Sequence, residues 1–333
     1  MTDANPPVLA LEALETRVRI GRASFPAVDG VSLELGQGES LAIVGESGCG
    51  KSMLALSVMG LLDPQVARIV SGRILFDGTD IAHLPQHRLR TLRGRDISMI
   101  FQEPMSSLNP VLTIGRQVAE VVRQHEGLSP RAARERAVEM LSLVQIPDPR
   151  SRAAAYPHQL SGGMRQRVLI AIALACSPRV LLADEPTTAL DVTVQAQILE
   201  LIMSLQQRLG MALVLITHDL GVVAETVSRV VVMYAGRKVE EASTTDLFAR
   251  PAHPYTQGLL GSLPSRARSE GLRRLRAIRG VVPPLTAPRQ GCLFASRCPH
   301  AVDGCREEAP ALGRVGPGHT VACWRAGELG DGP

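Results

Sequence analysis

Aromatic residues are scarce in this chain, and long apolar runs are missing. Phe, Trp and Tyr make up 3% of the 333 residues, which leaves few rings on which the bases of a single-stranded nucleic acid could stack. The longest unbroken apolar run, Val168 to Cys176, has nine residues, whereas a membrane-spanning helix needs about 20. The sequence therefore predicts no membrane-crossing segment and does not favour single-strand binding.

The chain also lacks a strong charge of one sign, and its first residues do not have the pattern of a secretion signal. Lys and Arg exceed Asp and Glu by 36 − 32 = 4, and part of this excess lies between Arg266 and Arg279, so the balance does not argue for nucleic acid. Residues 1–7 have neither the basic start nor the apolar stretch of a signal peptide. We expect a cytosolic, reducing location without stable disulfides.

A phosphate-loop pattern, G-x-x-x-x-G-K-[ST], follows a short apolar strand that ends at Val44. Its glycines let the backbone curl so that successive N–H groups face one anion, and a helix expected from Lys51 to Leu62 adds its positive N-terminal end. Lys51 is expected to reach the outer phosphates and Ser52 to hold Mg²⁺. The predicted nucleotide-binding residues are Gly45, Glu46, Ser47, Gly48, Cys49, Gly50, Lys51 and Ser52. The chain is therefore predicted to bind a nucleoside triphosphate.

The order of the expected elements predicts an α/β fold. Short apolar runs and turn residues in 8–44 indicate a small antiparallel sheet, and the pattern in 118–144 indicates an inserted helical subdomain. Between 180 and 233, strand-like runs alternate with helical stretches, which is typical of a parallel sheet. After about residue 249 the composition shifts toward Pro, Arg, Gly and Cys, so we expect a domain boundary there, followed by a C-terminal tail of residues 250–333.

Two carboxylates end the apolar strand that begins at Val180. Asp184 is expected to reach the Mg²⁺ site and Glu185 to act on an attacking water. Because adjacent residues of a strand point to opposite faces, Glu185 must lie where the strand ends and the chain turns, as Pro186 suggests.

A second anion site is predicted at the small residues Ser161, Gly162 and Gly163, which begin another helix. Such a start exposes N–H groups and the positive end of the helix dipole. One chain has no obvious need for two such sites, unless the second serves a nucleotide that a partner holds.

The chain resembles ABC-type ATPases at six spaced motifs, which occur in that family's order: Gly45–Ser52, Gln102, Leu160–Gln166, Asp184–Glu185, Asp191 and His218. The resemblance covers roughly residues 8–245. It implies a P-loop NTPase fold over 8–249, with a RecA-like core, an antiparallel β subdomain and a helical subdomain at about 103–177. In that family two such subunits pack head to tail and enclose two ATP molecules.

The resemblance also implies the role of each residue. The implied catalytic residues are Gln102, which senses Mg²⁺ and the water, Glu185, which polarises that water, and His218, which contacts the γ-phosphate. Ser52, Gln102 and Asp184 are the implied Mg²⁺ contacts. The residues implied at the nucleotide of the partner subunit are Ser161, Gly162, Gly163 and Gln166, with Asp191 at the dimer seam.

One departure from the family concerns adenine. An aromatic ring usually lies against the base about twenty residues or more before the phosphate loop, and here Arg22 and Phe25 are the nearby options. Phe25 could equally be a core residue, and Val28 is an apolar alternative, so the sequence leaves the adenine contact open.

Two further segments, Met99–Pro110 and His253–Leu260, resemble the ATPase subunits of dipeptide and oligopeptide importers. The resemblance implies a peripheral subunit at the cytoplasmic face of the bacterial inner membrane. It implies a second ATPase subunit in a heterodimer, two permease subunits coupled through the Gln102–Pro110 loop, and an extracytoplasmic solute-binding protein. The His253-Pro254-Tyr255 sequence itself is expected to be a turn with a buried tyrosine rather than a site of chemistry.

The C-terminal tail holds four of the six cysteines, Cys292, Cys298, Cys305 and Cys323, with five, six and seventeen residues between successive members. Zinc sites usually open with a tight C-x2-4-C pair, which is missing, whereas cluster-binding loops tolerate wider spacings. Related peptide-importer subunits with this pattern resemble [4Fe-4S] proteins. We therefore expect a structural [4Fe-4S] cluster, with Zn²⁺ or free thiols as alternatives. Cys49 and Cys176 are expected to be ordinary small residues.

Two other functions stay open. The same type of importer serves nickel chelates, glutathione or other small solutes in related systems. A soluble ABC-type ATPase acting on DNA or ribosomes fits less well, because the chain has neither a second Gly-Lys-Ser loop nor sustained heptads. We expect no nucleic-acid partner.

Overall fold

The computed structural model describes residues 6–102, 107–188, 190–263 and 277–328. The chain forms two compact units, each assembled from separate stretches. Unit 1 comprises residues 1–9, 35–39 and 76–215, and unit 2 comprises residues 10–34, 40–75 and 216–333. Neither unit ends at residue 249, and the boundary expected there stays a prediction.

The strands of unit 1 are buried and parallel. β6 (Ile97–Ile100) runs parallel to β7 (Val180–Asp184), with Ile97 opposite Val180. β8 (Ala212–Thr217), whose residues up to Leu215 belong to this unit, lies on the other side of β7. Such apolar runs suit strands that are covered on both faces, and the α/β prediction is confirmed.

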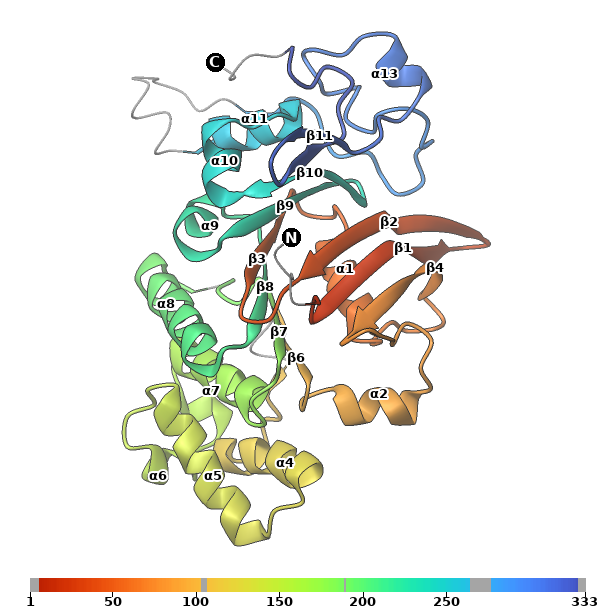
Figure 1. Cartoon of the computed structure of the whole chain (residues 1–333). Coiled ribbons are helices and arrows are strands. Elements are labelled where there is room, and N and C mark those ends of the chain that lie inside the picture. The colour runs from red at the N-terminus through yellow and green to blue at the C-terminus, as the bar shows by residue number, and fades with distance from the viewer. Residues whose placement is uncertain (1–5, 103–106, 189, 264–276, 329–333) are drawn as a thin grey trace. The chain divides into compact units, whose positions relative to one another are not determined.

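Helices α4 (Ile114–Glu126), α5 (Pro130–Leu143) and α7 (Gly162–Leu174) of unit 1 contact one another (Figure 1). The helical pattern expected over 118–144 is two helices, because Gly127 ends α4 with φ at 64° and the Ser129 side chain caps α5. The other elements of this unit are β5 (Thr79–Asp80), α2 (Gln86–Leu92), α6 (Pro149–Arg152), the 3₁₀ helix η1 (Pro157–Gln159) and α8 (Val192–Leu209).

Unit 2 contains the expected small sheet. β2 (Ala23–Leu35), β1 (Leu9–Ile20) and β4 (Ala67–Phe76) lie in that order. Only Gly21 and Arg22 separate β1 from β2, and two neighbouring strands joined by two residues form an antiparallel hairpin.

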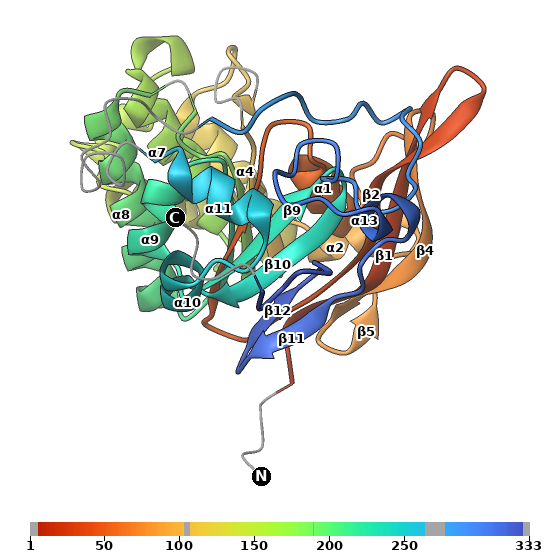
Figure 2. The ribbon, with the colours of Figure 1, turned by 90° about the horizontal axis from the view of Figure 1, so that it is seen from above.

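A second set of strands in unit 2 carries the phosphate loop. β3 (Ser40–Val44) runs parallel to β9 (Arg229–Tyr234), and β10 (Arg237–Ser243) returns antiparallel to β9. β12 (His319–Val321) then pairs with β10, and β11 (Gly313–Gly316) pairs with β12 (Figure 2). The C-terminal tail therefore adds strands to the same sheet as β3.

The helices of unit 2 include α1, which runs from Lys51 to Val58 rather than to Leu62, because Gly60 follows with φ at 59°. Farther along, α10 (Thr244–Ala249) packs on β10. The remaining helices of this unit are α9 (Leu220–Thr226), α11 (Pro254–Gly261) and α13 (Gly304–Glu307).

Within the described ranges, no helix has both the length and the apolar character needed to cross a bilayer.

Candidate functional site

The phosphate loop leaves β3 in a conformation that only glycine tolerates at two positions. Gly45 has φ at 151°, and a Cβ there would lie 2.2 Å from the carbonyl oxygen of Met233. Gly50 has φ at 101°, and its Cβ would lie 2.3 Å from the carbonyl oxygen of Ala27. The loop thus passes against the backbone of neighbouring strands, and side chains are excluded at both of its ends.

Lys51 lies inside this loop. Its side chain is 5% exposed, and Nζ donates hydrogen bonds to the carbonyl oxygens of Gly45 at 2.7 Å and Glu46 at 3.1 Å. Because Gly50 has no side chain to cap α1, the first N–H groups of the helix are available to an anion. One cation and the first N–H groups of α1 therefore lie at the loop for which the sequence predicts phosphate binding.

The other loop residues divide by exposure. Ser47 and Gly48 are exposed, and Ser52 is half-buried as the second residue of α1. Cys49 is fully buried, and its carbonyl oxygen accepts a hydrogen bond of 2.8 Å from Gly236 N–H. Burial raises the pKa of the Cys49 thiol, which suits a small packing residue rather than a reactive one.

In unit 1, the ends of two neighbouring strands bring the predicted water-activating groups together. Gln102 follows β6 and Glu185 follows β7, and Gln102 Nε2 donates to Glu185 Oε2 at 3.0 Å. Thr188 Oγ1 donates to the same oxygen at 3.1 Å. Glu185 has φ at 44°, a conformation rare for residues other than glycine, so the turn expected at this residue is confirmed. Asp184 is 4% exposed at the end of β7.

The predicted second anion site is the start of α7. Ser161 and Gly162 are exposed, and Ser161 Oγ accepts a hydrogen bond of 3.3 Å from Met164 N–H. A Cβ at Gly163 would lie 2.8 Å from Cγ1 of Val194, so glycine lets α7 approach the first turn of α8.

Two more predicted residues lie in this region. Asp191 caps α8, because its Oδ1 accepts a hydrogen bond of 3.0 Å from Val194 N–H. Gln166 is fully buried within α7. The contacts of Ser161, Gly163, Gln166 and Asp191 with a partner's nucleotide stay predictions.

His218 is exposed directly after β8 and precedes Asp219, whose Oδ1 caps α9 by accepting from Gly221 N–H at 2.8 Å. It belongs to unit 2, as the phosphate loop does, whereas Gln102, Asp184, Glu185 and the start of α7 belong to unit 1. The role of His218 at the γ-phosphate stays a prediction.

Residues 103–106 of the expected coupling loop lie outside the described residues.

The three residues that the sequence offers as contacts for adenine differ in exposure. Val28 is fully buried in β2 and has no free surface for a base, whereas Arg22 is exposed and Phe25 is half-buried. An adenine contact by Arg22 or Phe25 stays a prediction.

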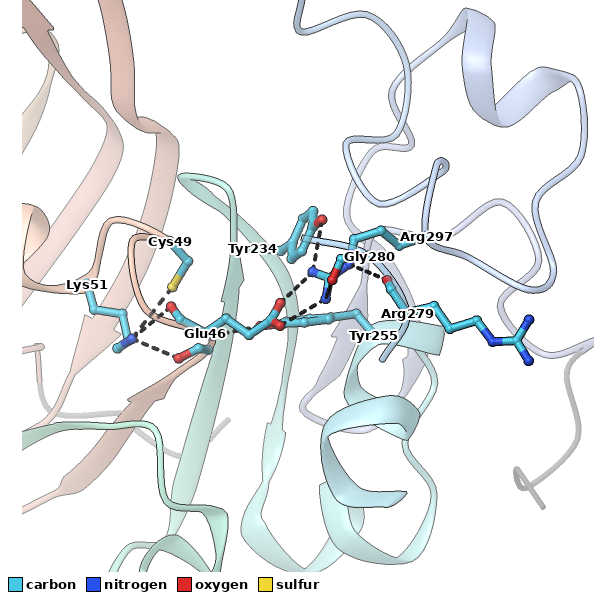
Figure 3. Close-up of polar contacts among 9 residues, drawn as sticks. Glu46, Cys49, Lys51, Tyr234, Tyr255, Arg279, Gly280 and Arg297 are labelled. Atoms are coloured by element: carbon cyan, nitrogen blue, oxygen red, sulfur yellow. Dashed lines mark hydrogen bonds and ion pairs between the residues drawn. The ribbon is translucent and has the colours of Figure 1, made fainter. Parts of the chain in front are cut away.

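Sequence reasoning missed two residues that touch the phosphate loop (Figure 3). Glu46 N–H donates to the Tyr255 hydroxyl oxygen at 2.8 Å, and Arg297 donates to both carboxylate oxygens of Glu46 at 2.6 and 2.9 Å. Tyr255 is buried, as expected, but its hydroxyl binds the loop. No local pattern in the sequence pointed to Arg297.

The iron–sulfur expectation is wrong. Cys292, Cys298, Cys305 and Cys323 line one cavity of about 20 Å³, which is room for about one water molecule. Burial raises the pKa of Cys292, Cys298 and Cys323. Among the described residues, no three or more His, Cys, Asp or Glu side chains are arranged to hold a metal ion. The [4Fe-4S] cluster is therefore contradicted, and the Zn²⁺ alternative is not supported either.

Comparison with known families gives two matches. The family described as "ABC transporter" matches residues 28–188, and the family described as "Oligopeptide/dipeptide transporter, C-terminal region" matches residues 239–305. The first match includes the phosphate loop and Glu185, and the second includes Tyr255 and Arg297.

Curated relatives match over nearly the whole chain. A probable peptide ABC transporter ATP-binding protein of Sinorhizobium fredii is 55% identical over 97% of this chain and 96% of the relative. The dipeptide transport ATP-binding protein DppD of Bacillus subtilis is 51% identical over 95% of this chain and 94% of its own. Its namesake in Escherichia coli is 50% identical, over 90% and 91%.

Solved structures show the same fold. A dimeric ATP-binding cassette, MJ0796, bound to ADP and Pi, superposes with a TM-score of 0.63 and 30% identity, over 71% of this chain and 98% of that one. The protein cbiO1 of Clostridium perfringens, described as part of an ABC transporter complex, gives 0.64 and 28%, over 80% of this chain and 100% of that one.

Proposed function

The chain belongs to the ATP-binding proteins of peptide ABC transporters, and on this premise we propose that it hydrolyses ATP to power the import of dipeptides or oligopeptides. One observation carries the proposal: relatives named as dipeptide transport proteins share half of their residues with this chain over at least nine tenths of both. The phosphate loop supplies the chemistry that such a subunit needs.

In the proposed reaction, ATP phosphates lie against the N–H groups of the loop and the start of α1, with Lys51 neutralising their charge. Ser52 and Asp184 offer the hard oxygen donors that suit Mg²⁺, and that ion would neutralise charge on the phosphate oxygens. Glu185 accepts the proton of the attacking water, while Gln102 holds the carboxylate in place through its 3.0 Å hydrogen bond.

Glu185→Gln tests the catalytic assignment. The variant keeps the shape of the side chain but loses the base, so hydrolysis should fall by about 100-fold or more while ATP affinity stays close to wild type. Steady-state hydrolysis and equilibrium binding of ATP measure the two properties. Glu200→Gln, an exposed change on α8, is the matched control. Full hydrolysis by the Glu185→Gln variant would contradict the assigned role.

We propose that the subunit works at the periphery of the bacterial inner membrane. Its proposed partners are a second ATPase subunit in a heterodimer, two permease subunits and an extracytoplasmic solute-binding protein. The names of the relatives support a transport complex, and the dimeric cassette that shares the fold supports pairing of two ATPase subunits.

Affinity purification of the chain from membranes tests these partners. Recovery of two permeases and a second ATPase supports the proposal, whereas recovery of ribosomes or DNA-bound proteins would overturn it. Uptake of a labelled dipeptide by the recovered complex, in competition with a nickel chelate or glutathione, then identifies the class of solute. Uptake of a labelled nickel chelate or glutathione, without uptake of the dipeptide, would exclude peptides.

A further inference from the structure

Glu46, the second residue of the phosphate loop, is bound from two directions (Figure 3). Its carbonyl oxygen accepts from Lys51 Nζ at 3.1 Å, which ties it to the cation expected to bind phosphate. Its N–H and its carboxylate bind Tyr255 and Arg297, which both belong to the C-terminal tail. The tail and the phosphate-binding lysine therefore hold the same residue.

Arg297 has a buried side chain, and its hydrogen bonds fix its orientation toward Glu46. Its side chain is 3% exposed, and the two terminal nitrogens form a bidentate pair with the Glu46 carboxylate. Nε donates to the carbonyl oxygen of Arg279 at 2.9 Å, which fixes the plane of the guanidinium. The pair with Glu46 raises the pKa of Arg297, so the group stays charged.

Tyr255 holds the backbone of the same residue. Its side chain is fully buried, and its hydroxyl oxygen accepts the Glu46 N–H bond at 2.8 Å. The ring meets Tyr234 edge-on with 4.7 Å between centroids, and Phe294 lies 5.4 Å from it. Few aromatic residues exist in this chain, and two of them, Tyr234 and Phe294, pack against the ring that carries this hydroxyl.

These contacts fix the peptide unit that opens the loop. A phosphate loop binds anions because successive N–H groups point at one centre, so a rotation of the Glu46 peptide would misdirect its neighbours. The residues that follow, Ser47 and Gly48, are exposed, whereas Tyr255 and Arg297 contact Glu46 from the tail.

We propose that Arg297 and Tyr255 are positioning residues that hold the phosphate loop in its nucleotide-binding conformation, so that ATP affinity depends on the docked C-terminal tail. The inference rests on the proposed binding of ATP by this loop and is independent of the solute transported. By linkage, bound ATP stabilises the docked tail to the same extent.

Equilibrium binding of Mg·ATP to the purified full chain tests the inference. Arg297→Gln should weaken binding by about tenfold, the factor expected from losing a charge-assisted bidentate contact. Arg306→Gln, which removes an exposed arginine of the tail, should change affinity less than twofold. In the assembled transporter, Arg297→Gln should raise KM for ATP more than it lowers kcat.

A double-variant cycle separates positioning from simple charge attraction. If Arg297 acts through Glu46, Arg297→Gln should have an effect below about twofold in a Glu46→Gln background. If its charge acted directly on the phosphates, the roughly tenfold loss would appear in both backgrounds, and the inference would fall. Arg297→Lys keeps the charge without the fork and should recover only part of the affinity.

Tyr255→Phe is a second variant that tests the inference, because it removes one hydroxyl and leaves the tail folded. It should weaken ATP binding by about threefold and leave the rest of the aromatic cluster in place. If Arg297→Gln does not fold, this variant decides the matter. Folded variants with wild-type ATP affinity overturn the inference alone, whereas a wild-type chain that binds no ATP overturns the proposed function as well.

Discussion

Replacing Glu240 with alanine tests how the C-terminal tail is held on β10. The Glu240 side chain is fully buried and accepts three hydrogen bonds, all from residues beyond β10. Oε1 accepts from Ala252 N–H and from His319 Nε2, both at 2.7 Å, and Oε2 accepts from His253 N–H at 2.9 Å. One carboxylate thus joins β10 to the residues just before α11 and to β12.

The expected loss follows from those three donors. A buried donor that loses its acceptor costs about 1–3 kcal/mol, and water that enters the space left by the carboxylate recovers part of this. Glu240→Ala should therefore lower the free energy of unfolding of the tail by roughly 4 kcal/mol. Glu240→Gln keeps an acceptor oxygen and the shape of the side chain, so it should cost about half as much.

Trp324 makes the measurement local. It is the only tryptophan in the sequence, and its Nε1 donates to the carbonyl oxygen of Glu308 within the tail at 3.0 Å. Urea denaturation followed by tryptophan fluorescence therefore reports on the tail. The matched control is Glu328→Ala, which removes an exposed partner of Arg325 and should cost less than about 1 kcal/mol. A Glu240→Ala curve that overlays the wild type would refute the reasoning.

Two further predictions concern His253 and Gly45. Burial lowers the pKa of His253 to about 4, so the neutral imidazole makes its full contribution to the free energy of unfolding above pH 6.5. This contribution, up to about 3 kcal/mol, is lost as the pH falls toward 4. Urea midpoints at several pH values should show this loss in the wild type and a weaker dependence in His253→Asn. Gly45→Ala should abolish ATP binding, because the added Cβ would lie 2.2 Å from the carbonyl oxygen of Met233. The control Gly48→Ala adds a Cβ with no atom within 4 Å, so it should only weaken ATP binding. Equal ATP affinities of the two variants would contradict the steric argument.

Local sequence determined the parts of the site that depend on neighbouring residues. The phosphate loop needs glycines, a lysine and the start of a helix, all within twelve residues from Leu41 to Ser52. The turn at Glu185 could be inferred because a strand cannot present Asp184 and Glu185 on one face, and φ at 44° confirms it. Helix starts at Ser161 and Asp191 are likewise local, because each side chain caps its own helix.

The cysteine pattern shows where such reasoning fails. Spacing along the chain indicated that four thiols could bind one metal centre, and the fold does place all four around one cavity. Spacing carries no information about the volume between the sulfurs or about their burial. The described residues accordingly offer no arrangement of ligands for the expected cluster.

The effect of the C-terminal tail on the loop depends on contacts between residues far apart in the sequence. Tyr255 and Arg297 reach Glu46 across 209 and 251 residues of sequence, and neither contact leaves a periodic or spaced pattern that could be found in the chain alone. The contacts exist because β10 pairs with β12 and the buried Glu240 fixes the residues before α11. A local motif is enough to predict that this protein binds a nucleotide with a phosphate loop. Long-range pairing and burial, which short sequence patterns do not encode, determined that its tail holds that loop.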